Sequence, residues 1–255
     1  MINRQKALRG TGFEHVEAWV FDLDNTLYPG DCDLFTEIDA RMGAFIAERL
    51  GLSHEDAQRL RKHYYYTYGT TLAGLMRLHD VCPNAFLDYV HDIDLSVISP
   101  APELGQALDA LSGRKFIFTN GSRQHAERVI TRLGLEGRFE DVFDIHASEF
   151  IPKPERAAYE RFMDAHGVAG GNAAMFDDLP HNLATAHQVG MTTVLVACGR
   201  TDHPEHDAIA GWTELPPHIH HRTDALANFL AGISAARAEE ERVGEIAPMA
   251  QFCLT

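Results

Sequence analysis

The pattern of apolar and polar positions begins with a short apolar run and then changes to a helical period. Residues 18–21 (AWVF) are all apolar, which is typical of a buried strand. Over residues 34–50 the apolar side chains recur at helical spacing, which predicts a helix that ends at Gly51. A second helix is expected to begin near Ser53, whose hydroxyl can cap it, and a third helical piece is expected over residues 84–91.

Beyond residue 103 the pattern changes to strands that alternate with helices. Strands are expected at residues 115–118, 142–145, 173–176, 192–196 and 218–221, and helices at residues 104–111, 123–133, 154–166, 182–189 and 224–233. This alternation predicts an α/β fold with a doubly wound, Rossmann-like parallel sheet. Ligands of such sheets bind at the carboxyl ends of the strands.

Two turn-rich segments, Tyr28-Pro29-Gly30-Asp31 and Ser99-Pro100-Ala101-Pro102, separate the first helices from the rest of the chain. They predict a small helical domain inserted into the α/β core. The expected division is a core of residues 1–29 and 100–233, an inserted domain of residues 30–99, and a mobile tail of residues 234–255.

The charge of the chain limits the partners to be expected. The 255 residues include 22 Lys and Arg and 37 Asp and Glu, for a formal net charge of -15. This balance argues against a nucleic-acid polymer or an anionic membrane as partner, whereas a small anionic substrate needs cations only at the site. Residues 1–12 contain no apolar run of signal-peptide length, and no stretch approaches the roughly 20 apolar residues of a membrane span, so we expect a cytoplasmic protein. A monomer or a homodimer is expected. The four cysteines form no CxxC pair and are expected to be free thiols.

Two carboxylates, Asp22 and Asp24, follow the first strand directly. Strand side chains repeat every two residues, so both leave toward the same side unless the chain bends. Two like charges that close would raise one pKa unless a positive charge lay between them. A divalent cation, and magnesium in particular, meets that need, because it favours carboxylate and phosphate oxygens. An acidic turn after a core strand, without a ligand, is the alternative.

A hydroxyl and a tight turn, Thr119-Asn120-Gly121-Ser122, follow the strand at residues 115–118. The hydroxyl, the backbone N–H groups and the start of the next helix can together bind phosphate oxygens. An ordinary capping turn has the same composition.

Lys153 and the pair Asp177-Asp178 come next along the chain. Lys153 lies between two prolines that restrict the backbone and aim the ammonium, although a solvated lysine in a turn is the alternative. The acidic pair follows another predicted strand, where adjacent carboxylates are costly without a cation. It is also compatible with an acidic turn without a ligand.

The histidine groups at residues 203–206 and 218–221 raise the question of a zinc site. Their spacings match no closed set of four ligands, so surface histidines are the expected interpretation.

The order of these groups at four strand ends, DxD, Thr, Lys and DD, resembles the phosphatases of the haloacid dehalogenase superfamily, over about Glu17 to Leu230. In that comparison the inserted helices look like the superfamily's cap domain. Within the superfamily the chain resembles the pyrimidine 5'-nucleotidase group. The strings that carry this resemblance are DLDNTLYP (residues 22–29), YGTTLAGL (68–75), VHDID (90–94) and FTNGSR (118–123) followed by His125-Ala126.

The resemblance implies a catalytic mechanism. Asp22 would attack phosphorus and form an aspartyl-phosphate, while Asp24 would protonate the leaving group and later take a proton from water. Magnesium would be held by the Asp22 carboxylate, the Asp24 backbone carbonyl and Asp178, with Asp177 acting directly or through water. The groups expected to bind the phosphoryl group are Thr119, Asn120, Gly121 and Lys153.

Substrate selection would lie in the cap, which would close over the site by hinging at the two turn-rich segments. The candidates there are Tyr64, Tyr65, Tyr66, Thr70, Thr71, His91, Asp92 and Asp94, of which Tyr65, Thr70 and His91 are the predicted substrate-binding residues. An aromatic ring can stack on a base, but a tyrosine can equally belong to the core of the cap.

The resemblance also separates branches of the superfamily. Dehalogenases are expected to lack a carboxylate at the position of Asp24, because a halide needs no proton to leave, so its presence favours phosphate esters. One departure is Leu179 after the acidic pair, where a small hydroxylated residue is expected.

The predicted function is a magnesium-dependent phosphomonoesterase acting on pyrimidine nucleoside 5'-monophosphates. The alternatives are a broad-specificity phosphatase of small metabolites (phosphoglycolate, sugar phosphates, pyridoxal phosphate), a sugar phosphomutase, and a non-catalytic sensor of a phosphorylated ligand.

Overall fold

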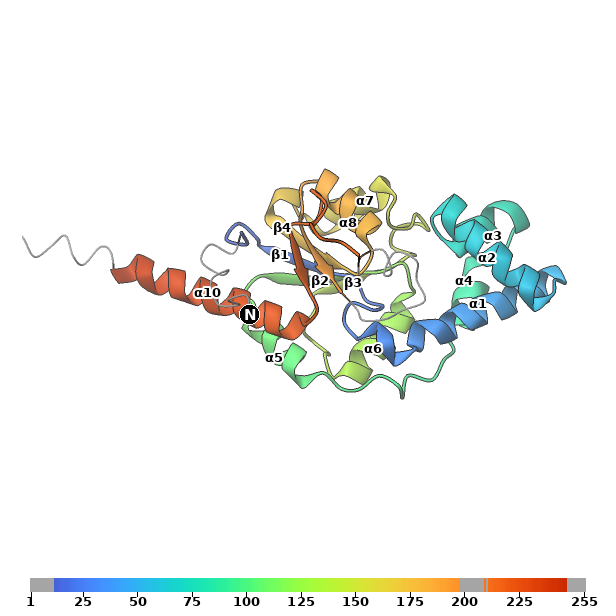
Figure 1. The fold of residues 1–255 in the computed structure, drawn as a ribbon, viewed down its shortest axis with the longest axis horizontal. Coiled ribbons are helices and arrows are strands. Elements are labelled where there is room, and N and C mark those ends of the chain that lie inside the picture. Colours follow the sequence, from blue (N-terminus) through green and yellow to red (C-terminus); the bar gives the residue numbers. More distant parts are fainter. Residues whose placement is uncertain (1–11, 198–208, 210, 247–255) are drawn as a thin grey trace, which may run out of the picture.

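A six-stranded parallel sheet forms the centre of the computed structural model, which describes residues 12–197, 209 and 211–246 (Figure 1). Its strand order is β3-β2-β1-β4-β5-β6. The strands are β1 (Ala18–Phe21), β2 (Arg114–Phe118), β3 (Asp141–Phe143), β4 (Ala173–Asp177), β5 (Thr192–Val196) and β6 (His221–Thr223). The predicted α/β class with a doubly wound parallel sheet is confirmed.

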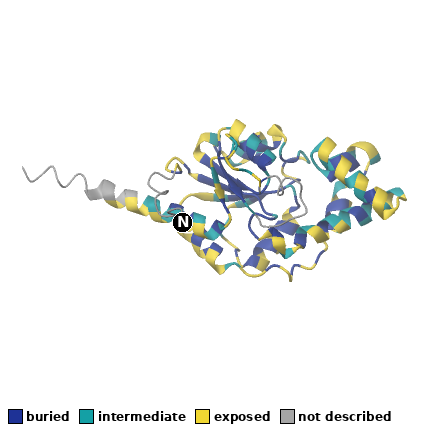
Figure 2. Ribbon diagram, in the orientation of Figure 1, coloured by how far each residue is buried: buried dark blue, intermediate teal, exposed yellow. Residues whose placement is uncertain are grey.

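Helices cover both faces of the sheet because successive side chains of each strand point to opposite sides. In β1, Trp19 and Phe21 pack in one apolar cluster, whereas Ala18 and Val20 pack in the other. Helices α5 (Pro102–Ala110), α6 (Arg123–Leu133) and α10 (Leu226–Ile246) contribute to the first cluster, and helices α7 (Arg156–His166) and α8 (Pro180–Gln188) to the second. Figure 2 shows the resulting buried sheet between more exposed helices.

The first strand lies in the middle of the sheet, between β2 and β4. The register pairs Phe21 with Ile117 on one side and with Phe176 on the other. The residues that follow these three strands therefore meet at one edge of the sheet. The chain order also reverses here, because β4 adds to the side of β1 opposite to β2, and ligands bind at such a switch point.

Four helices, α1 (Leu34–Leu50), α2 (His54–Tyr68), α3 (Thr71–His79) and α4 (Pro83–Val90), follow a short 3-10 helix, η1 (Gly30–Cys32). They pack on one another at one end of the molecule, beyond the sheet (Figure 1). Ser53 caps α2 as predicted, by accepting a hydrogen bond from the Asp56 amide at 3.1 Å. Thr70 caps α3 in the same way, through the Ala73 amide. We call residues 34–90 the helical insertion.

The connection from the helical insertion back to the core lies along α6. Arg128 donates hydrogen bonds to the carbonyl oxygens of His91 and Ile93, and Arg132 donates to those of Leu95 and Ile98. Both arginines belong to α6, so the returning chain is attached to the core helix over several residues.

The C-terminal part of the chain differs from the prediction. The helix expected to end near Ile233 continues to Ile246, so much of the predicted mobile tail is helical. Apolar periodicity stops near Ile233, but the following residues are rich in Ala, Glu and Arg, which have high helix propensity. Arg237 attaches this part of α10 to the core by donating to the carbonyl oxygen of Val16 at 2.6 Å, and its guanidinium lies over the ring of Trp19.

Smaller differences concern element ends. Strand β6 lies three residues later than expected, and α7 and α8 each begin two residues away from the predicted position. A 3-10 helix, η2 (Gly170–Asn172), precedes β4. Of the cysteines, Cys32 and Cys82 are free thiols, whereas Cys198 and Cys253 lie outside the described residues. Across the described ranges, no helix combines the length and the apolar character needed to cross a membrane.

Candidate active site

Asp22 lies at the centre of the site, directly beyond β1. Its amide continues the sheet ladder by donating to the carbonyl oxygen of Phe176 at 2.8 Å. The hydroxyl of Thr26 donates to Oδ2 of Asp22 at 3.2 Å. The carboxylate is buried. Strand pairing therefore fixes the backbone of Asp22, and only the direction of its carboxylate depends on other side chains.

A buried ammonium provides the positive charge next to Asp22. Nζ of Lys153 donates to Oδ1 of Asp22 at 2.7 Å and to Oδ2 of Asp177 at 2.8 Å. Lys153 is 1% exposed, and it precedes α7 in the loop after β3. The side chain of Asn120 holds the backbone of Lys153 by accepting from its amide and donating to its carbonyl oxygen. The lysine is thus an internal ion-pair partner rather than a solvated residue.

Three buried carboxylates, those of Asp22, Asp177 and Asp178, have ligand oxygens within 4.8 Å of one another. Burial raises the pKa of Asp22 well above its ordinary value, and the two neighbouring carboxylates add to this effect against the attraction of Lys153. One ammonium leaves this group with an excess of negative charge. An all-oxygen donor set with that excess fits a hard divalent cation.

Asp177 accepts hydrogen bonds from several groups around it. In addition to Lys153, it accepts from the Leu179 amide at 2.9 Å and from Nδ2 of Asn182 at 3.0 and 3.1 Å. Asp178 instead lines the cavity described below. Oδ1 of Asn182 is buried without a hydrogen-bond partner in the described part of the chain, which suits a site completed by a ligand or water.

Asp24 has a different set of partners. Its Oδ1 accepts hydrogen bonds from the hydroxyl of Tyr28 at 2.6 Å and from Nε2 of His125 at 2.9 Å. The chain bends after Asp24, since Asn25 has a φ of 62°. Burial alone would raise the pKa of Asp24, but His125 and Tyr28 together hold it below its ordinary value. The two carboxylates of the DxD motif therefore lie in different environments.

The turn after β2 is compact, as its sequence predicts. Oγ1 of Thr119 accepts from the Gly121 amide at 2.9 Å, and Ser122 caps α6 by accepting from the His125 amide. A Cβ at Gly121 would lie 3.3 Å from Oγ1 of Thr119, so a side chain there would crowd the hydroxyl. This turn brings a hydroxyl and the start of a helix to the same sheet edge as Asp22.

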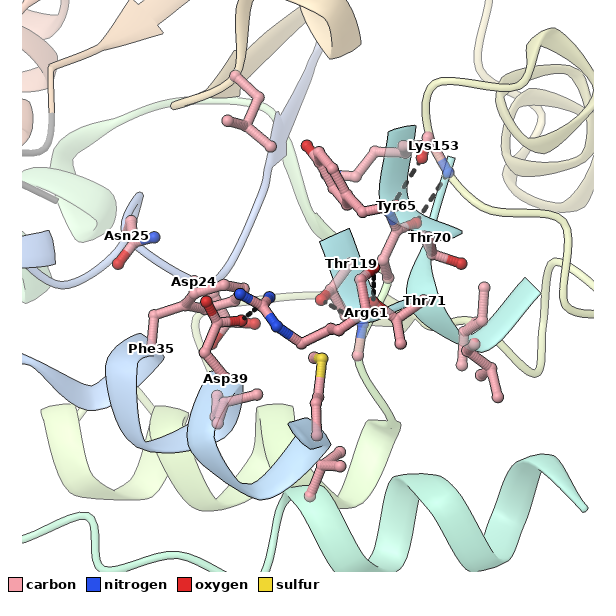
Figure 3. Close-up of a pocket in the computed structure, with 18 of the residues that line it drawn as sticks. Asp24, Asn25, Phe35, Asp39, Arg61, Tyr65, Thr70, Thr71, Thr119 and Lys153 are labelled. Atoms are coloured by element: carbon pink, nitrogen blue, oxygen red, sulfur yellow. Dashed lines mark hydrogen bonds and ion pairs between the residues drawn. The ribbon is translucent and has the colours of Figure 1, made fainter. Parts of the chain in front are cut away.

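A cavity of about 250 Å³ joins the sheet edge to the helical insertion (Figure 3). On the core side it is lined by Asp22, Asp24, Asn25, Thr119, Asn120, Gly121, Lys153 and Asp178. On the insertion side its polar and aromatic lining includes Phe35, Asp39, Arg61, Lys62, Tyr65, Tyr66, Thr70, Thr71 and His91. Every residue predicted to bind the phosphoryl group or the substrate thus borders one space.

Three of the other residues predicted as cap candidates lie away from the cavity. Tyr64 is buried in the insertion, and its hydroxyl contacts Nε2 of His79 at 2.5 Å. Asp92 is exposed, and Asp94 binds Ser96.

In the second histidine group, residues 218–221, the ring of His220 contacts Thr193. Within the described ranges, only the group of Asp22, Asp177 and Asp178 has the geometry of a possible metal site. Residues 203–206 lie outside those ranges.

Several site residues were missed by the sequence interpretation. Nη1 of Arg61 donates to Oδ1 of Asp39 at 2.6 Å, which joins α2 to α1 beside the cavity. No sequence signal indicates such a pair, because it depends on how two helices pack. Tyr28 and His125 also carry no signal of their own as partners of Asp24. The strings that carry the family resemblance include both residues but give them no role, and the position of His125 in the first turn after the cap residue Ser122 places it near the strand ends.

Comparison with known proteins gives a family match. The sequence model of the haloacid dehalogenase-like hydrolase family matches residues 16–190, which is more than half of the chain. Phosphate metabolism protein 8 of Saccharomyces cerevisiae is 28% identical over 196 residues, which are 70% of this chain and 61% of that protein. The chain thus spans less than two thirds of the length of this relative.

Solved structures show a similar fold. A structure described as a HAD phosphatase from Thermococcus onnurineus aligns with a TM-score of 0.55 at 19% identity, over 84% of this chain and 96% of that chain. A 2-haloacid dehalogenase from Pseudomonas syringae aligns with a TM-score of 0.53 at 18% identity, over 86% of this chain and 99% of that chain. At these identities the likeness concerns the fold alone.

The buried ammonium leads to a prediction about stability. Lys153→Met should lower the free energy of unfolding by about 3 kcal/mol or more, because it leaves Asp22 and Asp177 buried without their cationic partner. Urea unfolding in the presence of a chelator measures the change. Lys62→Met is the matched control, since Lys62 is exposed, and it should stay within about 0.5 kcal/mol of the wild type. Equal effects of the two substitutions would contradict the assignment.

Proposed function

Because this chain belongs to the haloacid dehalogenase-like hydrolase family, we propose that it is a magnesium-dependent phosphomonoesterase. Its substrates are pyrimidine nucleoside 5'-monophosphates, and Asp22 is the nucleophile. The observation that carries the proposal is the pairing of buried Asp22 with Lys153 beside a second carboxylate, Asp24, which has different partners. Both carboxylates border the cavity that reaches the helical insertion.

Hydrolysis proceeds in two displacements. A carboxylate oxygen of Asp22 forms a bond to phosphorus, the ester P–O bond breaks, and Asp24 gives a proton to the departing oxygen. Water then forms a bond to phosphorus and loses a proton to Asp24, while the bond between phosphorus and Asp22 breaks. Inorganic phosphate leaves, and Asp24 is again protonated for the next cycle.

The lowered pKa of Asp24 keeps it in the carboxylate form, which is the form that accepts a proton in the second displacement. For the first displacement Asp24 must hold a proton. The arrival of a phosphate dianion raises the pKa of a nearby carboxyl by like-charge repulsion, which favours this protonated form.

The phosphoryl group is placed by the residues at the strand ends. Lys153, the Thr119 hydroxyl and the turn through Gly121 offer a positive charge and donors at the same edge as Asp22. Asp22, Asp178 and the backbone carbonyl of Asp24 would hold magnesium. The cation, when bound, neutralises charge on the phosphoryl oxygens. Asp177 is held by hydrogen bonds from Lys153 and Asn182, and it would stabilise the metal site next to Asp178.

Two features favour a phosphate ester over a carbon–halogen bond. Asp24 supplies a proton that a departing alkoxide needs and a departing halide does not. The yeast relative carries a name that refers to phosphate metabolism, which agrees with this chemistry. The structural neighbours include both a phosphatase and a dehalogenase, so the fold by itself does not separate the two reactions.

The insertion side of the cavity supports a planar, polar leaving group. Phe35 and Tyr65 offer aromatic surface for stacking, and Thr70 offers a hydroxyl. The ion pair of Arg61 with Asp39 presents a donor beside an acceptor. A uracil edge carries carbonyl oxygens on either side of an N–H, so it can accept from Arg61 and donate to Asp39.

Phosphate release from a substrate panel tests this function. The panel comprises UMP, CMP, dUMP, AMP, GMP, phosphoglycolate, pyridoxal phosphate and sugar phosphates, each with magnesium or with a chelator. We expect magnesium-dependent turnover of the pyrimidine monophosphates and a loss of at least about 1,000-fold in Asp22→Asn.

The panel also separates the alternatives. Similar rates of phosphate release from all esters would support a phosphatase but would reject pyrimidine nucleotides as its specific substrates. Isomerisation of a sugar phosphate that outpaces phosphate release would indicate a mutase, and an inactive wild type would reject the hydrolase.

Magnesium should also stabilise the protein in the absence of substrate. A cation that binds only the folded protein raises its melting temperature, by about 5 °C when it is present at about 100 times its dissociation constant. Thermal unfolding with magnesium or chelator measures this shift. Asp178→Asn should abolish it, whereas Asp92→Asn, which changes an exposed carboxylate, should retain it. An unchanged shift in Asp178→Asn would place the magnesium site elsewhere.

Recognition of the base can be tested on helix α2. Arg61→Met should raise KM for UMP by roughly 10-fold or more while leaving hydrolysis of p-nitrophenyl phosphate nearly unchanged, since that ester has no uracil edge. Arg59→Met is the matched control, because Arg59 lies on the same helix but pairs with Glu55 and Asp56 at the surface. An equal loss with both substrates would instead indicate that Arg61 only supports the fold of the insertion.

A further inference from the structure

We propose that Tyr28 and His125 are positioning residues that orient Asp24 for proton transfer, and that His91, which directly follows the helical insertion, fixes the ring of His125. This inference rests on the proposed function, because it concerns the group that protonates the leaving oxygen. Of these three residues, His91 borders the cavity, whereas Tyr28 and His125 lie outside its lining.

The hydrogen bonds to Asp24 define one orientation of its carboxylate. The Tyr28 hydroxyl and Nε2 of His125 both donate to the same oxygen, Oδ1, at 2.6 and 2.9 Å. Within the described residues, Oδ2 of Asp24 has no hydrogen-bond partner, and the residue borders the cavity. Oδ1 is therefore the anchored oxygen and Oδ2 the one that exchanges a proton with substrate or water.

The surroundings of His125 hold its ring in place for the contact with Asp24. It has no exposed surface, and its amide is bound by the Ser122 hydroxyl at the start of α6. Because a carboxylate accepts, the hydrogen of this contact must lie on Nε2. The other ring nitrogen, Nδ1, is buried without a partner in the described structure. A buried nitrogen without a partner is unfavourable for folding, and such groups persist where function retains them.

His91 holds the ring of His125 from the side of the helical insertion. The two rings are stacked with centroids 4.3 Å apart and an angle of 9° between their planes. Nδ1 of His91 contacts the Ser122 hydroxyl at 3.1 Å, and the carbonyl oxygen of His91 accepts from Arg128 at 2.6 Å. Burial and the neighbouring His125 lower the pKa of His91 to about 3, so its ring is neutral.

His91 directly follows α4, the last helix of the insertion. A change in the position of the insertion would therefore reach His125 through the stacked rings. It would then reach Asp24 through the hydrogen bond that His125 donates. A displaced insertion would leave the proton-transfer group less well oriented. A misplacement of about 1 Å can lower a rate by about 100-fold.

Leaving-group dependence tests the inference, because a merely structural defect affects all substrates alike. Phenyl phosphate and p-nitrophenyl phosphate are of similar size, but only the phenolate needs a proton to leave readily. The constant to measure is kcat/KM, which reports the first displacement. Tyr28→Phe and His125→Ala should each lose about 10- to 100-fold with phenyl phosphate and less than about threefold with p-nitrophenyl phosphate.

Conservative and control variants sharpen the test. His125→Gln keeps an N–H donor and should recover most of the activity toward phenyl phosphate. His91→Ala should show the same selective loss, in a weaker form. Tyr89→Phe and His63→Ala change residues outside the cavity lining and should leave both constants unchanged. Tyr28→Phe removes only a hydroxyl, so it remains informative if His125→Ala fails to fold.

The outcomes separate this inference from the proposed function. If the wild type is active, and Tyr28→Phe and His125→Ala each lower kcat/KM equally for both substrates, the positioning role is overturned. The proposed phosphatase function is then unaffected. A wild type that hydrolyses neither ester, nor any member of the nucleotide and metabolite panel, would overturn both.

Discussion

The buried contacts of Lys153 with Asp22 and Asp177 are the constraint on which the site depends. They join a residue beyond β1, a residue at the end of β4 and a loop that follows β3. Asn120, which follows β2, holds the backbone of the same lysine. A buried charge is strongly unfavourable without a partner, so these segments are stable only when they meet in this arrangement. Parallel pairing brings the strand ends to one edge, and the ammonium then fixes the directions of the carboxylates.

From this arrangement follows the difference between the two acids of the DxD motif. Asp22 is held by an ammonium among other carboxylates, which suits a nucleophile that must become bonded to an electron-poor phosphorus. Asp24 is held by a hydroxyl and an imidazole at the border of the cavity, which suits proton transfer. In the proposed mechanism, two carboxylates two residues apart thus take two chemical roles that their different surroundings favour. The same geometry links Asp24 to the helical insertion through His125 and His91.

The parts of the site that could be predicted from the sequence are those fixed by strand register. Asp22, Thr119 and Asp177 follow apolar runs, and the ends of neighbouring parallel strands must meet, so their proximity follows from local patterns. The Arg61–Asp39 pair and the contacts of His125 depend on how helices rotate and pack, which local patterns do not determine. The end of α10 was missed because the apolar period of the sequence stops near Ile233, although the residues that follow have high helix propensity and Arg237 is bound to the core.

Detection of a phosphoryl group on Asp22 is the most direct test of the proposed chemistry. Wild-type protein is mixed with UMP and magnesium for milliseconds, quenched in acid and digested, and the mass of the peptide that contains Asp22 is measured. We predict a phosphorylated peptide that forms and decays at least as fast as turnover and is absent in Asp22→Asn. Turnover without phosphorylation of Asp22, or undiminished turnover by Asp22→Asn, would contradict the assignment of Asp22 as the nucleophile.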